Sequence, residues 1–80
     1  MLKKLQEYIQ DNDFRLTIFN NKLYIINYIK IISLENDKII VEDKNKKIII
    51  KGENFILNKL LEKEALISGV ITNIEVRYDW

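Results

Sequence analysis

The stretch Val70-Ile71-Thr72-Asn73-Ile74-Glu75-Val76-Arg77-Tyr78 has the clearest two-residue alternation in the chain. Every second residue in it is apolar or β-branched, so an extended strand would collect these side chains on one face. Ala65, Ile67, Gly69 and Ile71 fall on the opposite parity. The buried face therefore changes near Gly69, which predicts a bulge or sharp bend at a residue that tolerates one.

Similar extended runs fill most of the chain before this stretch. They are Phe14 to Phe19, Lys22 to Ile26, Tyr28 to Leu34, Lys38 to Glu42, Lys47 to Lys51 and Phe55 to Lys59. Polar segments suited to tight turns separate them: Asn20-Asn21, Glu35-Asn36-Asp37, Asp43 to Lys46 and Gly52-Glu53-Asn54. We expect hairpin turns at all four segments, and a connection at Leu60 to Ala65.

This spacing predicts one all-β domain over residues 1–80: a small antiparallel β roll or barrel of serial hairpins, with the β region at 14–78. A β-solenoid is the alternative architecture. Leu2, Leu5, Tyr8 and Ile9 recur at helical spacing, which predicts a short N-terminal helix over residues 1–12. Ile48-Ile49-Ile50 and Ile25-Ile26 are apolar on both parities, so we expect these strands to be central or covered on both faces.

The composition excludes several kinds of chemistry. The chain has no histidine and no cysteine, so it cannot build a Ser-His-Asp or Cys-His site, a thiolate metal site or a disulfide. Carboxylates are paired at Asp11/Asp13, Glu42/Asp43 and Glu62/Glu64, and a hydrolase would need such a pair to face one cleft. Each pair lies in a predicted turn or linker beside lysine, so we expect solvated surface groups. We expect no enzyme activity, metal or cofactor.

Nucleic-acid binding is the alternative function. Small β-barrels bind single strands by stacking bases on aromatic side chains, and Phe19, Tyr24 and Tyr28 lie among lysines. A basic cluster runs through Lys44, Lys46, Lys47 and Lys51. The net charge is only +1, and carboxylates interrupt the cluster, so no nucleic-acid partner is expected.

Four segments occur in the order seen in the YabP/YqfC family of sporulation proteins. They are Arg15-Leu-Thr17, Leu23-Tyr-Ile25-Ile-Asn27, Ile48-Ile-Ile50-Lys-Gly52-Glu-Asn-Phe55-Ile-Leu57 and Ile67-Ser-Gly69-Val-Ile71. The chain resembles this family from about Phe14 to Tyr78, and its Arg-x-Thr start is closer to the YqfC branch. The motif residues that the resemblance singles out are Arg15, Thr17, Ile25, Asn27, Gly52, Glu53 and Gly69.

The resemblance implies a protein without catalytic activity that acts in the mother cell of a Gram-positive spore former during endospore formation. We therefore expect a homo-oligomer, or docking to a small membrane-associated sporulation protein. The expected location is the cytoplasm, with peripheral association at the forespore membrane through that partner. Serial hairpins leave unpaired strand edges, and we expect Lys22, Lys30, Lys38 and Lys51 to protect them.

Overall fold

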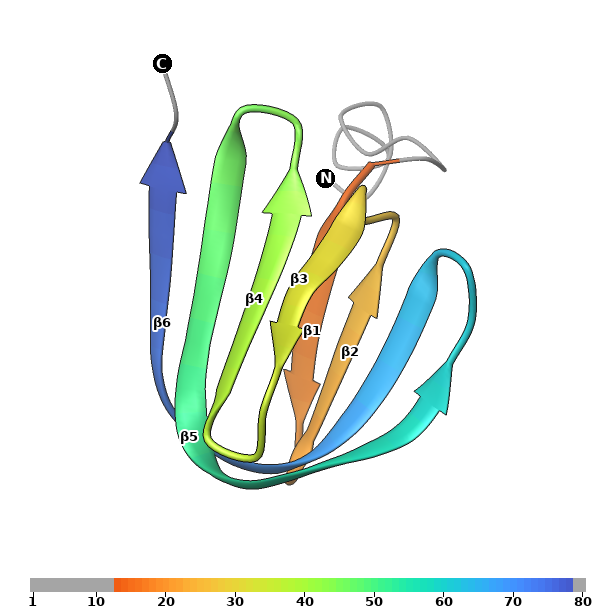
Figure 1. The fold of residues 1–80 in the computed structure, drawn as a ribbon. Coiled ribbons are helices and arrows are strands. Elements are labelled where there is room, and N and C mark those ends of the chain that lie inside the picture. Colours follow the sequence, from red (N-terminus) through yellow and green to blue (C-terminus); the bar gives the residue numbers. More distant parts are fainter. Residues whose placement is uncertain (1–12, 79–80) are drawn as a thin grey trace, which may run out of the picture.

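The computed structural model describes residues 13–78, which form one open sheet of six antiparallel strands (Figure 1). The strands are β1 (Arg15–Phe19), β2 (Lys22–Ile26), β3 (Lys30–Leu34), β4 (Lys38–Asp43), β5 (Lys46–Leu60) and β6 (Glu64–Tyr78). Their order across the sheet is β1-β2-β6-β5-β4-β3. The predicted all-β fold of antiparallel hairpins is confirmed. The pairing is that of a roll and not of a solenoid, and the predicted helix over 1–12 lies outside the described residues.

Polar turns connect the short strands largely where the sequence predicts them. Asn20-Asn21 joins β1 to β2, and Asn20 takes a φ of 54°, the positive value that asparagine tolerates in tight turns. Lys44 takes a φ of 47° between β4 and β5. The connection predicted at Leu60 to Ala65 contains the turn of the β5–β6 hairpin, where the Leu61 amide donates to the Glu64 carbonyl at 2.8 Å.

The expected turn at Gly52-Glu53-Asn54 is wrong. Residues 46–60 form one continuous strand that bends, and its partner β6 bends with it (Figure 1). Extra residues absorb the curvature, because the register between the two strands shifts next to Gly52 and again between Glu53 and Ile56. Asn54 takes a positive φ of 57° inside this bent strand and not in a hairpin turn.

The predicted bend near Gly69 is confirmed. Gly69 has a φ of +147°, a value that side chains rarely permit. The buried parity of β6 changes slightly later, at Thr72, which the register shift opposite Lys51 and Gly52 leaves without a direct partner on β5. After that shift Ile74 and Val76 lie opposite the buried Ile50 and Ile48.

The bend folds the sheet into two four-stranded halves. The first half contains β3, β4, residues 46–51 of β5 and residues 73–78 of β6. The second half contains β1, β2, residues 64–68 of β6 and residues 56–60 of β5. The inner faces of the two halves form one core, and both halves contribute buried side chains to it. The second half contributes Leu23, Ile25, Ala65 and Ile67, and the first half contributes Ile39, Val41, Ile48 and Ile50.

Hairpin turns from the two halves hold the bend in place. The Gly52 amide donates to the Asp37 carbonyl at 3.0 Å, and the Phe55 amide donates to the Asn36 carbonyl at 2.8 Å. In the same way the Gly69 amide donates to the Asn21 carbonyl at 2.9 Å. The β3–β4 turn thus binds the bend of β5 and the β1–β2 turn binds the bend of β6. Each turn satisfies donors that the curvature would otherwise leave without a partner.

Strands that are apolar on both parities are central in the sheet, as predicted, but only one of their faces is buried. Ile48 and Ile50 are in the core, whereas Ile49 points to the outer face and is partly exposed. Ile25 and Ile26 differ in the same way. Within the part of the chain that the structure describes, no second layer covers the outer face.

The close approach of the strands at the bend makes Gly52→Ala strongly destabilising. A Cβ atom there would lie 1.9 Å from the Val70 carbonyl oxygen and 2.7 Å from Cζ of Phe55, so the backbone must move. We expect the free energy of unfolding to fall by about 1–3 kcal/mol or more, measured by urea denaturation. The neighbouring Lys51→Ala is the control, since its exposed side chain predicts a change within about 0.5 kcal/mol. Equal stability of both variants would contradict this account of the bend.

Candidate interaction surface

Four strand segments are paired on one side only among the described residues. We call them the four edges: β1, β3, residues 56–60 of β5 and residues 70–78 of β6. Each edge presents a row of backbone amide and carbonyl groups to which another strand could add. They result directly from the bend. On one side of it β5 lies between β4 and β6, so β6 is the edge strand. On the other side β6 lies between β2 and β5, so β5 is the edge strand.

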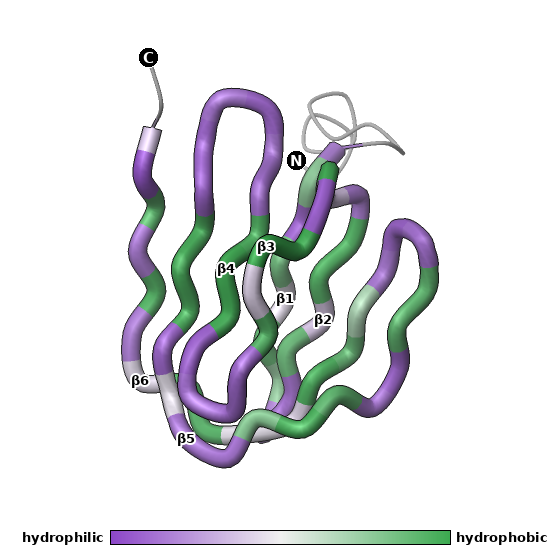
Figure 2. The backbone as a smooth tube through the Cα atoms, in the orientation of Figure 1, coloured by the Kyte–Doolittle hydropathy of each residue, from purple (hydrophilic) through white to green (hydrophobic). Residues whose placement is uncertain are grey.

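Exposed apolar side chains concentrate on these edges. Within residues 13–78, all of the large exposed apolar residues except two lie in the four edges: Ile18, Phe19, Ile32, Leu34, Ile56, Leu57, Leu60, Val70, Ile74, Val76 and Tyr78. The two exceptions, Ile29 and Leu61, directly adjoin β3 and β5. Figure 2 shows that hydrophobic residues extend to the outermost strands, while hydrophilic residues gather at the turns. Apolar exposure next to unpaired backbone is typical of an interaction surface.

Lysine protects the edges less than expected. Lys30 begins the β3 edge, but Lys22, Lys38 and Lys51 lie in strands that are paired on both sides. Their protective role at an edge is therefore a wrong prediction. Two edges are instead interrupted by irregular register, between Ile31 and Ser33 in β3 and between Leu57 and Lys59 in β5. Such bulges hinder the addition of another strand.

The β6 edge carries an ion pair on its outer face. Nε of Arg77 donates to Oε2 of Glu75 at 2.5 Å, and the Arg77 side chain is well exposed while that of Glu75 is partly exposed. The two residues are two apart in a strand, so their side chains point to the same side. This hydrogen bond, together with the positive charge of Arg77, lowers the pKa of Glu75 below its ordinary value of 4.5. The alternation of β6 alone would have placed these two charges on one face, and neither residue was among the predicted site residues.

The residues that the resemblance to the YabP/YqfC family singles out lie in two separate places. Gly52, Glu53 and Gly69 meet at the bend, where Glu53 pairs with Val70. The other four belong to the β1–β2 hairpin and its end: Arg15 and Thr17 on the outer face, Ile25 in the core, and Asn27 after β2.

Asn27 connects three segments of the chain. With a φ of 61°, it donates its side-chain amide to the Asp13 carbonyl at 2.8 Å and its backbone amide to the Lys63 carbonyl at 2.7 Å. Nearby, the buried Tyr28 hydroxyl donates to the Leu61 carbonyl at 2.9 Å, and burial raises the pKa of Tyr28. The motif residues thus hold the backbone together at two points.

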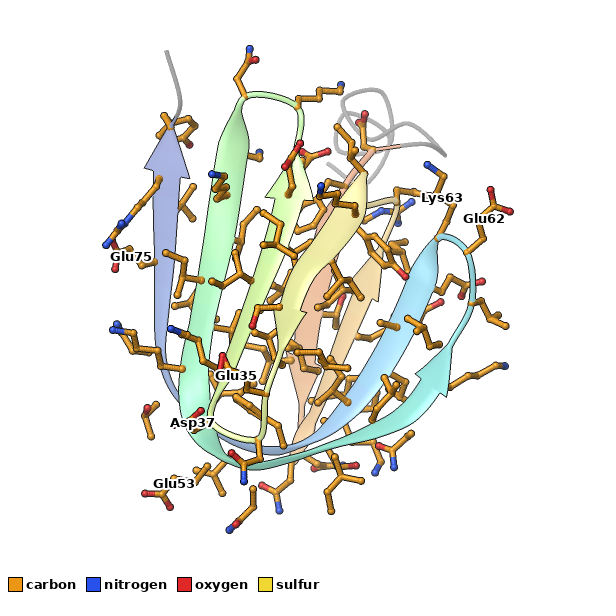
Figure 3. All side chains as sticks on the ribbon, viewed as in Figure 1. Glu35, Asp37, Glu53, Glu62, Lys63 and Glu75 are labelled. Carbon is orange, nitrogen blue, oxygen red and sulfur yellow. The ribbon has the colours of Figure 1, made fainter. Side chains whose placement is uncertain are left out.

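The paired carboxylates do not share a cleft among the described residues. Glu42 and Asp43 are consecutive in β4, so their side chains point to opposite faces, and Asp43 is buried near Lys46. Glu64 accepts a hydrogen bond from the Tyr24 hydroxyl, which raises the pKa of Tyr24. Glu62 points outward at the tip of the β5–β6 hairpin (Figure 3). Asp11 lies outside the described range.

The predicted basic cluster is divided between the two faces of the sheet. Lys46 lies toward the inner face, with Nζ 3.8 Å from Oδ2 of Asp43 and 5.8 Å from the centre of the Phe14 ring. Lys47 and Lys51 project from the outer face of the same strand. Tyr28 is a core residue and offers no stacking surface. In residues 13–78 no group of three acidic residues lies close enough to hold a metal ion.

Comparison of the chain with family models, curated proteins and solved structures finds no match. No helix in the described part of the chain is long and apolar enough to cross a membrane.

The ion pair on β6 predicts a measurable change in Glu75. The pKa of Glu75 is lowered in the folded chain, so the interaction stabilises the fold at neutral pH and is lost as the pH falls through this lowered pKa. Arg77→Ala should return the pKa of Glu75 to its ordinary range in an NMR titration of the side-chain carboxyl. Arg15→Ala, a control on another strand, should leave it unchanged. An unchanged pKa in Arg77→Ala would refute the interaction.

Proposed function

We propose that this protein is a non-enzymatic assembly module that works by self-association or by docking to a membrane-associated partner. The single observation that supports it most is the coincidence of exposed apolar side chains with the unpaired strand edges. Strand addition at an edge would supply backbone hydrogen bonds, and apolar side chains beside the edge would be buried by the same contact.

A small core adds a second physical reason. A domain of 80 residues buries a limited fraction of its surface, and cores of this size supply about 3–5 kcal/mol of stability. Only ten apolar side chains are buried among the described residues, and more than that number of large apolar side chains are exposed. Association would remove part of this exposed surface from water, so binding would stabilise the fold as well as serve the function.

The biological setting in this proposal is endospore formation. The ordered motifs that resemble the YabP/YqfC family support a cytoplasmic protein of the mother cell that associates peripherally with the forespore membrane through its partner. The motif residues Gly52 and Gly69 shape the bend from which the edges arise, so a family that kept them would keep the edges too.

The assembly role predicts that the full chain forms species heavier than its 9.6 kDa monomer as concentration rises, measured by sedimentation velocity. Val76→Lys should reduce association, because it places a charge beside the exposed β6 edge without changing the core. Asn45→Lys adds the same charge in the exposed β4–β5 turn and should have no effect. A chain that remains monomeric at every soluble concentration would remove the self-association half of the proposal.

The sporulation role predicts expression confined to the mother cell during spore formation, from a gene beside one that encodes a membrane protein. Loss of the gene should lower the number of heat-resistant spores and leave vegetative growth unchanged. Uniform expression during growth, with normal sporulation after deletion, would contradict this setting and leave the assembly role standing.

A further inference from the structure

We propose that two copies of this chain pair through residues 74–78 of β6, antiparallel and in one register, with Val76 of one copy opposite Val76 of the other. This inference rests on the proposed self-association and names its surface and its geometry. It joins the first halves of two sheets into one continuous sheet across a two-fold axis.

The β6 edge is the best suited of the four to pair with a copy of itself. Residues 73–78 keep a regular register with residues 46–51 of β5, whereas bulges interrupt the edges of β3 and β5. β1 is also regular, but its outer face carries Arg15, Thr17 and Phe19 and no carboxylate. Two copies of β1 would therefore bring arginine to the contact without an opposite charge.

Charge selects the register. In a two-fold antiparallel pair, residues opposite each other share a face, and opposite charges stabilise the pair while like charges destabilise it. Centring the pair on Val76 places Glu75 of each copy opposite Arg77 of the other. Centring it on Glu75 or on Arg77 would place like charges in contact. Centring it on Ile74 would reach the irregular position at Thr72 and leave both charges without an opposite partner.

The apolar residues supply the association itself. Val76 and Ile74 lie on the inner face, yet 45% and 38% of their surfaces are exposed because β6 is the edge. In the proposed register Val76 meets Val76, and Ile74 meets Tyr78, whose surface is 59% exposed. Arg77 already binds Glu75 within its own strand, so pairing exchanges one ion pair for another. The charges therefore determine which register forms but add little to the affinity of the two copies for each other.

Charge reversal tests the register. Glu75→Arg and Arg77→Glu should each weaken dimer formation about tenfold, because each places two like-charged pairs across the contact. An equimolar mixture of the two variants should recover association as a heterodimer, detected by native mass spectrometry. Recovery also proves that both variants fold. Glu62→Arg, which makes the same charge change at the β5–β6 turn, is the control and should dimerise as the unaltered chain does.

The outcomes separate this inference from the proposed function. Single variants that dimerise normally would overturn the β6 register, and so would a mixture that fails to recover association. In either case an unaltered chain that associates would do so through another surface, and the proposed self-association would stand. An unaltered chain that never associates would overturn both the register and the self-association from which it follows.

Discussion

The close packing of β5 against β6 at Gly52 and Gly69 is the constraint on which the rest of the structure depends. The ring of Phe55 lies where a Cβ atom on either glycine would be, and the Val70 carbonyl leaves no room for a side chain at Gly52. Two long strands can therefore bend together as one ribbon. The bend brings the two inner faces into one core, and turns from both halves bind it through the amides of Gly52, Phe55 and Gly69.

The same bend creates the candidate surface. A sheet that closed into a barrel would have no edges, and a flat one would have two. Here the exchange of β5 and β6 between the halves leaves four one-sided segments among residues 13–78, and most of the large exposed apolar side chains lie along them. Apolar surface beside one-sided strands favours association with another strand, which supports the assembly role proposed above.

Local sequence was sufficient to predict most strands and turns, because alternation and asparagine turns act over a few residues. The segment Gly52-Glu53-Asn54 could not be predicted correctly from local sequence, since its residues suit a hairpin turn and a bulged bend equally well. The difference is decided by Val70 and Gly69, which are distant in sequence. The prediction that lysines protect the strand edges was wrong for a similar reason. Strand order depends on long-range pairing, which the local sequence pattern does not determine. The charges of Glu75 and Arg77 could have been paired from alternation alone.

The central claim is that the edge of β6 is where the protein assembles. Amide hydrogen exchange along residues 73–78, measured at low and high concentration of the same chain, tests it most directly. The account predicts that exchange at alternate amides of this segment slows as concentration rises, while amides of β1, β3 and residues 56–60 do not change. Concentration-independent exchange along β6 in a chain that associates, or slowing at another edge instead, would contradict it.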